Sequence, residues 1–179
     1  TDVGLAPSTR YYYMIASVDQ SGNEGPRSAA AFASTNPPQL SGWPLELVDP
    51  SANSPAVGDI DAYGANEVVV GNDRLYAWRS DGNEVVDGDQ QAVTWGVISP
   101  QGDDFIGPAA LADLDGTPGF EIAAAAYTSK QVFCFDGDGT VMPGWPRPTV
   151  DVVRAGVVVG DIDGDDEPDA RCCNMDGET

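Results

Sequence analysis

The chain has 179 residues and carries 29 acidic but only 8 basic side chains, a formal net charge of −21 at pH 7. It contains no histidine, which excludes Ser-His-Asp and Cys-His catalytic systems, HExxH zinc sites and a histidine general base. One lysine and seven arginines cannot form the basic surface that phosphate binding requires, so we expect no nucleic-acid partner.

The composition indicates β structure. The 21 glycines and 14 prolines are many for a helical protein and typical of short strands joined by tight turns. No apolar run approaches the roughly 20 residues of a membrane-spanning helix, so we expect no membrane span in this segment. The acidity itself fits either a halotolerant surface or bound divalent cations that neutralise clustered carboxylates.

The first element in chain order is a predicted β-hairpin. Residues 11–18 are aromatic and β-branched, residues 19–23 (Asp-Gln-Ser-Gly-Asn) predict a turn, and residues 28–35 predict a second strand of small side chains. Pro37 and Pro38 then exclude a helix and favour an extended linker. The predicted division of the chain is a first domain at 1–35, a linker at 36–39 and a second domain at 40–179.

Residues 4–11 (Gly-Leu-Ala-Pro-Ser-Thr-Arg-Tyr), with Val-Asp at 18–19 and Gly-Asn-Glu at 22–24, resemble the second half of a fibronectin type III domain. The resemblance implies a tyrosine corner, in which the Tyr11 hydroxyl bonds back to the preceding loop. A complete sandwich of this family has about 100 residues, and two strands alone cannot bury a core. We therefore expect the chain to be part of a longer one, or another molecule to supply the missing strands.

The second domain repeats itself. The pattern Val/Ala-x-Gly/Ala-Asp-Ile/Leu-Asp occurs three times, and its leading aspartates are Asp59, Asp113 and Asp161. An apolar strand follows each copy, and Gly-Trp-Pro recurs at 42–44 and 144–146. A period of about 50 residues with several short strands predicts β-propeller blades, with a β-solenoid as the alternative. We expect an all-β chain with about two and a half blades, fewer than the four to eight of a closed propeller.

Residues 161–169 (Asp-Ile-Asp-Gly-Asp-Asp-Glu-Pro-Asp) predict a cation-binding loop. Carboxylates at positions 1, 3, 5 and 9 converge because alternate residues of an extended chain face the same side, and position 7 adds its carbonyl oxygen. Several anionic oxygen ligands in a flexible loop favour calcium over magnesium or zinc. An EF-hand is excluded, because its position 12 is occupied in the three loops by Val70, Ala124 and Cys172.

The same frame applies to all three loops. The predicted ligands are Asp59, Asp61, the carbonyl of Ala65 and Glu67 in loop 1 (residues 59–67), Asp113, Asp115, Thr117, the carbonyl of Gly119 and Glu121 in loop 2 (residues 113–121), and Asp161, Asp163, Asp165, the carbonyl of Glu167 and Asp169 in loop 3 (residues 161–169). Tyr63 offers no carboxylate at position 5 of loop 1, and Thr117 offers only a hydroxyl in loop 2. The alternative is an acidic turn that its own backbone amides stabilise without a metal. This alternative is favoured in the loops whose position 5 has no carboxylate.

These loops and the strands around them resemble the FG-GAP or VCBS repeats of integrin-type propellers and of many secreted bacterial proteins. The resemblance covers residues 40–179 and implies an extracellular, calcium-stabilised β-propeller with its cation sites in the turn between two strands of each blade. Tyr63 and Thr117 depart from the pattern of the family at their two sites.

Other side chains give weaker signals. Cys134 lies in an apolar run and is expected to be a buried, inert thiol, while Cys172 and Cys173 have no CxxC or histidine partner for zinc. The four tryptophans, Trp43, Trp78, Trp95 and Trp145, are expected in the core rather than in a sugar-binding cleft. The segment between residues 87 and 104 is expected to be an irregular surface loop and the best place for a ligand.

We expect a secreted or cell-surface calcium-binding module for adhesion or assembly. It would be non-catalytic, because its paired carboxylates lie in cation-type loops and not in a glycosidase arrangement. The expected partners are an extracellular protein, a glycan or neighbouring copies of the chain. The alternative is an accessory or propeller region of a secreted hydrolase, such as a peptidase or a polysaccharide lyase.

Overall fold

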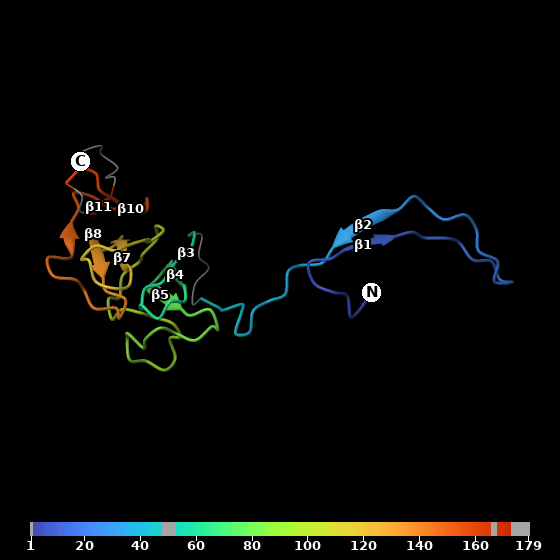
Figure 1. Cartoon of the computed structure of the whole chain (residues 1–179), viewed down its shortest axis with the longest axis horizontal. Helices are drawn as coiled ribbons and strands as arrows, with labels where there is room; N and C mark the ends of the chain where they lie inside the picture. The colour runs from blue at the N-terminus through green and yellow to red at the C-terminus, as the bar shows by residue number, and fades with distance from the viewer. Residues whose placement is uncertain (1, 48–52, 166–167, 173–179) are drawn as a thin grey trace. The chain divides into compact units, whose positions relative to one another are not determined.

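The computed structural model describes residues 2–47, 53–165 and 168–172, and in these ranges the protein is all-β, with eleven strands and no helix (Figure 1). None of these residues belongs to a helix long and apolar enough to cross a membrane. The chain divides into two compact units, Thr1–Leu40 and Ser41–Thr179. The first unit thus ends directly after residues 36–39, the segment with the two adjacent prolines.

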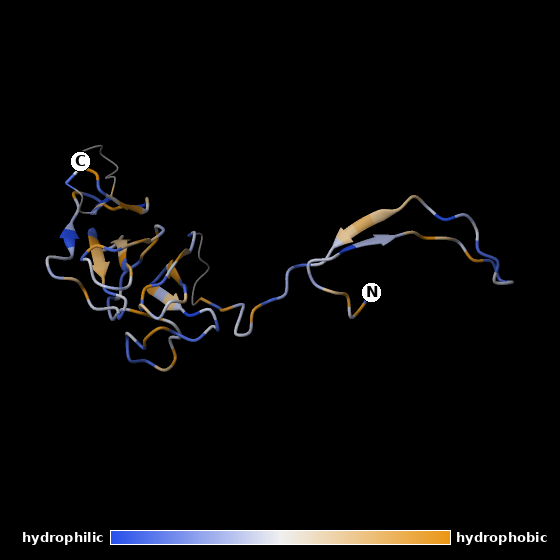
Figure 2. Cartoon of the chain, viewed as in Figure 1, coloured by the Kyte–Doolittle hydropathy of each residue, from blue (hydrophilic) through white to orange (hydrophobic). Residues whose placement is uncertain are grey.

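The first unit is a two-stranded antiparallel hairpin. Strands β1 (Arg10–Tyr13) and β2 (Ala31–Ser34) pair with Tyr12 opposite Phe32. Both strands are shorter than the predicted ones at 11–18 and 28–35. The Tyr11 hydroxyl accepts a hydrogen bond from Ala6 N–H at 2.7 Å, the backward bond expected for this residue. Every residue of β2 is exposed, and Figure 2 shows its apolar character. Within this unit the hairpin therefore buries no core of its own.

In the described part of the second unit, three small antiparallel sheets follow one another along the chain. Sheet 1 consists of β3 (Ala56–Gly58), β4 (Glu67–Gly71) and β5 (Leu75–Trp78). Sheet 2 consists of β6 (Ala110–Ala112), β7 (Glu121–Ala126), β8 (Gln131–Phe135) and β9 (Arg147–Pro148). Sheet 3 consists of β10 (Val157–Gly160) and β11 (Asp169–Cys172). Each sheet contains one copy of the repeated sequence. Among the residues described, no sheet closes on itself.

The repeats have the same register. In each sheet one loop of the predicted cation type joins the first strand to the second, and position 9 of the loop begins that second strand. The equivalent pairs are Gly58 with Glu67, Ala112 with Glu121, and Gly160 with Asp169. Local sequence therefore builds the same hairpin three times, with its carboxylates at the same place in each.

Sheet 2 is buried on both faces, and this explains its sequence. All six residues of β7 (Glu-Ile-Ala-Ala-Ala-Ala) are buried. Ile122, Ala124 and Ala126 pack into the cluster shared with sheet 1, while Ala123 and Ala125 pack into the cluster shared with sheet 3. A strand with two buried faces has no polar side to alternate with, so the usual period of two disappears from the sequence.

The expected surface loop contributes to the core, which corrects part of the prediction. Val97 and Ile98 are buried, and Ile98 N–H bonds to Leu75 O at 3.0 Å along the free edge of β5. Phe105 is also fully buried and meets Phe133 and Phe135 edge-on, with ring centroids 6.1 Å apart. Exposed residues occur in the middle of the segment and near both of its ends. Of the four tryptophans, only Trp78 is buried and Trp95 is exposed, while Cys134 is buried as expected.

A Phe105→Ala substitution should lower the free energy of unfolding by about 3–5 kcal/mol, because it leaves a cavity beside the rings of Phe133 and Phe135. Urea denaturation of the whole chain measures this loss. Val93→Ala, in the segment that precedes Phe105 and 88% exposed, is the control and should change stability by less than about 0.5 kcal/mol. Equal effects of the two changes would show that Phe105 is not part of the core.

Asp103 holds the turn between β7 and β8. Its two carboxylate oxygens accept hydrogen bonds from the N–H groups of Thr128 and Ser129, each at 2.9 Å. Burial raises the pKa of this carboxyl, but the hydrogen bonds from Ser129 and Thr128 outweigh it and lower the pKa below its usual value of 3.8. The ionised form is therefore the one that stabilises the turn.

Asp103→Asn should cost about 1–2 kcal/mol of stability at neutral pH. A carboxyl with a lowered folded-state pKa stabilises fully above its unfolded pKa, and this contribution disappears as the pH falls through the folded pKa. The difference between wild type and variant should therefore shrink below pH 3.8. Thermal melts at a series of pH values measure it. Asp104→Asn is the matched control, and a difference independent of pH would contradict this role for Asp103.

Candidate metal centres

Among the described residues of the second unit there are three clusters of carboxylate oxygens, one in each loop. In every cluster, one oxygen from each of three acidic residues lies within 4.8 Å of the other two. The three residues stand at positions 1, 3 and 9 of the predicted frame. They are Asp59, Asp61 and Glu67 in loop 1, Asp113, Asp115 and Glu121 in loop 2, and Asp161, Asp163 and Asp169 in loop 3. Such a group of oxygens can hold a metal ion.

The carboxylate at position 9 ties the two ends of each loop together. Glu67 accepts a hydrogen bond from Ile60 N–H at 3.0 Å, Glu121 accepts one from Leu114 N–H, and Asp169 accepts one from Ile162 N–H at 3.3 Å. In all three cases the donor stands at position 2 of the loop. One carboxylate oxygen at position 9 therefore fixes the turn in each loop.

Burial makes the first two clusters electrostatically strained. Glu67 and Glu121 are each only 1% exposed. Burial, and then the charges of Asp61 and Asp59, raise the pKa of Glu67 above its usual value. Burial, and then the nearby aspartates of loop 2, raise the pKa of Glu121 in the same way. At neutral pH each loop thus gathers three carboxylates whose mutual repulsion a cation would relieve.

The aspartate at position 1 bonds to the backbone of its own loop. Asp59 accepts a hydrogen bond from Gly64 N–H at 2.9 Å, Asp113 accepts one from Gly116 N–H at 2.7 Å, and Asp161 accepts one from Gly164 N–H at 2.6 Å. The three glycines have positive φ angles of 81°, 77° and 83°. The backbone amides therefore satisfy part of each cluster, as the metal-free alternative requires.

In loop 1 the backbone amides leave one carboxylate oxygen of the cluster without a hydrogen bond. Asp59 Oδ1 is buried and has no hydrogen-bond partner among the described residues. A buried carboxylate oxygen without a donor is costly, and native proteins rarely leave one unpaired. The donor set, made of oxygens alone, with Asp59 Oδ1 unpaired, fits a hard divalent cation.

Position 3 differs between the loops. Asp61 Oδ1 accepts a hydrogen bond from Tyr63 N–H at 3.2 Å, and its Oδ2 accepts two from Arg79, from Nε at 3.1 Å and from Nη2 at 2.9 Å. Asp115 Oδ1 likewise accepts from Thr117 N–H at 2.9 Å, but no arginine reaches its Oδ2 within the part of the chain described. Arg79 is thus a residue of the site that the loop frame did not predict.

Of the acidic side chains that the structure describes in the three loops, only those at positions 1, 3 and 9 belong to the clusters. Tyr63 is 83% exposed, and Thr117 is exposed on loop 2. Asp165 donates its N–H to Asp161 at 3.1 Å, but its carboxylate is not one of the three clustered groups of loop 3. Ala65 and Gly119 occupy position 7 of their loops. Glu167, like Cys173, lies outside the described residues.

Loop 1 also contacts sheet 2. Asp59 O accepts a hydrogen bond from Phe120 N–H at 2.9 Å, and a Cβ added to Gly137 would lie 1.8 Å from Ile60 O. A pocket of about 330 Å³ adjoins this contact, lined by Asp61, Tyr63, Arg79, Pro118, Asp136 and Asp138 among others. Loop 1 is therefore part of the junction between the two sheets.

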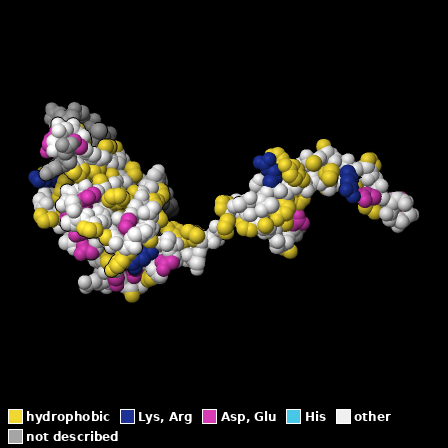
Figure 3. Space-filling model, in the orientation of Figure 1, with side chains coloured by type: hydrophobic (Ala, Val, Ile, Leu, Met, Phe, Trp, Pro, Cys, Tyr) yellow, Lys and Arg dark blue, Asp and Glu magenta, His cyan; other side chains and the backbone are white. Residues whose placement is uncertain are grey.

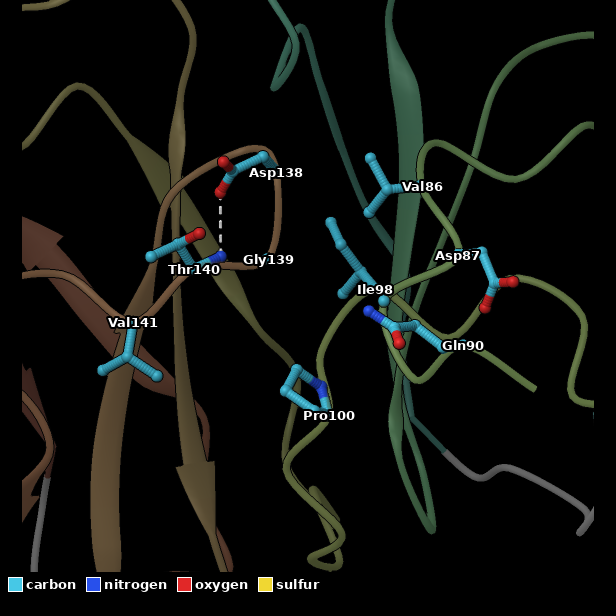
Figure 4. A pocket seen from close by; sticks show the side chains of 10 residues that line it. Val86, Asp87, Gln90, Ile98, Pro100, Asp138, Gly139, Thr140 and Val141 are labelled. Carbon is cyan, nitrogen blue, oxygen red and sulfur yellow. Dashed lines mark hydrogen bonds between the residues drawn. The ribbon is translucent and has the colours of Figure 1, made fainter.

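A second pocket, of about 400 Å³, lies between the sheets (Figure 4). Val86, Gln90 and Ile98 face it from the side of sheet 1, and the turn with Asp138 and Thr140 faces it from the side of sheet 2. Asp138 Oδ1 already accepts a hydrogen bond from Thr140 N–H at 2.9 Å. The pocket residues include no thiol, serine or lysine, so this cavity offers no nucleophile of those kinds.

The comparisons with known proteins add no identification: no protein-family model matches the chain, and no curated protein matches it. On the face shown in Figure 3, acidic side chains recur over the second unit and basic ones are few. The three carboxylate clusters are therefore the basis for inferring what this unit binds.

Proposed function

We propose that the second unit is a calcium-binding structural module in which a divalent cation neutralises each loop and braces the contact between neighbouring sheets. The observation that carries the proposal is the convergence of three carboxylates within 4.8 Å at the same register of three successive hairpins. A chance acidic surface would not repeat one geometry three times, including two carboxylates that are 1% exposed. The unpaired, buried Asp59 Oδ1 supports the same interpretation.

Calcium suits these loops better than other common metals. The clustered ligands are carboxylate oxygens on a turn, which suit hard cations, and zinc would favour the histidine and thiolate ligands that are absent from the clusters. A bound calcium ion would supply the positive charge that the clustered carboxylates lack. The protein supplies the rest: position 9 closes the loop through its bond to position 2, and position 1 shapes the turn through a glycine amide.

The wider role that we propose is non-catalytic adhesion or assembly outside the cell. In this proposal the three sheets are successive blades of an FG-GAP-like propeller, and the first unit contributes strands F and G of a fibronectin type III sandwich. The partners would be an extracellular protein, a glycan or further copies of the chain. The repeated sheet-and-loop unit supports this role, since repeat arrays commonly present extended binding surfaces.

Calcium should raise the melting temperature of the chain, and EDTA should reverse the rise. A ligand at 100 times its dissociation constant stabilises the folded state by about 2.7 kcal/mol per site. Differential scanning calorimetry in calcium and in EDTA measures the shift. Glu121→Gln keeps the shape of the side chain but removes one charged ligand, so it should reduce the shift, whereas Glu46→Gln, at an exposed position, should not. A wild-type melting temperature that is the same in calcium and in EDTA would overturn the proposal.

The adhesive role predicts calcium-dependent binding. Arrays of glycans and of matrix proteins, probed with the chain in calcium and in EDTA, should give signals that disappear with the chelator. Sedimentation of the chain alone tests self-assembly. A monodisperse monomer that binds nothing on either array would contradict the adhesive role and leave the calcium-binding role to be judged by calorimetry.

A further inference from the structure

We propose that Arg79 is a built-in counter-charge for loop 1, so that loop 1 depends less on a divalent cation than loop 2 and binds one more weakly. The inference rests on the proposed calcium-binding function. It adds to that function an order among the sites, set by a residue outside the repeated loop pattern.

The position of Arg79 follows from hairpin register. Val68 of β4 pairs with Trp78 of β5, so Arg79, the next residue, lies beside Glu67 at the end of loop 1. Two of its N–H groups donate to Asp61 Oδ2, and Nη1 donates to Glu84 O at 3.3 Å. The Asp61 side chain is 9% exposed and that of Arg79 is 39% exposed. The guanidinium is thus held from two sides against a nearly buried carboxylate.

Sheet 2 has an acidic residue at the equivalent place. Ile122 pairs with Phe135, so Asp136 lies beside Glu121 as Arg79 lies beside Glu67. The two residues also open the same kind of turn: Arg79 N–H bonds to Asn83 O and Asp136 N–H bonds to Thr140 O, both at 2.8 Å. Asp136 supplies no positive charge to loop 2, and its Oδ1 accepts a hydrogen bond from Gly137 N–H at 2.7 Å.

Loop 3 does not reproduce the arrangement of loop 1. Its nearest arginine, Arg171, lies 3.7 Å from Asp169 Oδ1, beyond hydrogen-bond length, and its side chain is 59% exposed. Loop 3 also has Asp165 at position 5, where loop 1 has Tyr63. Loop 1 therefore combines the loss of an oxygen ligand with the gain of a guanidinium.

The missing ligand at position 5 and the guanidinium of Arg79 both lower the affinity of loop 1 for a cation. Both oxygens of Asp61 are already hydrogen-bonded, so a cation entering loop 1 must displace Arg79 or share Asp61 with it. The repulsion between the guanidinium and a divalent ion a few ångströms away weakens binding, and solvent screening at a partly exposed arginine limits the effect to about tenfold. Without a cation, the same guanidinium offsets the repulsion among the three carboxylates.

Calcium titration calorimetry of the whole chain tests the affinity. Arg79→Gln should tighten the weakest site about tenfold and leave the others within about twofold. Adding Glu67→Gln to that variant should abolish the tightened site and so assign it to loop 1. Arg79→Lys keeps the charge and should bind like wild type. Arg154→Gln is the control for net charge, because Arg154 packs on the Tyr127 ring with its guanidinium carbon 4.8 Å from the centroid.

Amide hydrogen exchange of the wild-type chain in EDTA tests the bracing without any substitution. The N–H groups of Tyr63 and Gly64 in loop 1 should exchange at least about tenfold more slowly than those of Gly116 and Thr117 in loop 2, which make the equivalent bonds. Arg79→Gln should remove this difference.

The outcomes separate this inference from the function on which it rests. Three calcium ions bound with affinities that Arg79→Gln leaves unchanged, or equal exchange in the two loops, would overturn the role of Arg79 and leave the calcium-binding function standing. A wild-type chain that binds no calcium would overturn the function itself. The exchange comparison would then still decide whether Arg79 braces loop 1.

Discussion

Repulsion among clustered carboxylates at the turns of three hairpins is the constraint on which the second unit depends. Glu67 and Glu121 are buried, and each begins a strand that has a neighbouring strand on both sides. Each clusters with two aspartates from its own loop. Hydrogen bonds from the backbone fix one oxygen of each glutamate but carry no compensating full charge. In the function proposed above, a cation, or the guanidinium of Arg79 in loop 1, would supply the charge that keeps these turns closed.

The turns affect the whole unit because loop 1 belongs to a junction between sheets. Asp59 and Ile60 contact residues of sheet 2 through their carbonyl groups, while the apolar side chains of both sheets share one cluster. Sheet 2 in turn shares its other face with sheet 3. Order in loop 1 and burial of apolar surface therefore support each other, which is how a small ion can influence the packing of sheets.

Sequence reasoning found the acidic clusters because they depend on local spacing. Alternation places positions 1 and 3 on one side of the turn, and the hairpin returns position 9 to the same place, so the convergence could be predicted from one short segment. Arg79 could not be found this way, since only the register of β4 with β5 brings it to loop 1. That register was itself within reach, because the turn at Asp81 and Gly82 marks the end of the strand.

The core was harder to predict than the loops. Val97, Ile98 and Phe105 lie in a segment rich in polar and turn-forming residues, without the alternation that marks a strand, yet tertiary contacts bury all three. The repeat predicted an all-β unit of short strands, and the structure confirms this among the described residues. How many sheets a complete array contains depends on contacts that a single repeat does not encode.

The most direct measurement is a high-resolution crystal structure of the chain grown with calcium, with anomalous scattering used to locate the ions. We predict anomalous density within about 2.3–2.6 Å of the oxygens of Asp113, Asp115 and Glu121 in loop 2. Loops without ions, whose aspartates turn away from one another into water, would contradict the central claim that a cation neutralises these turns.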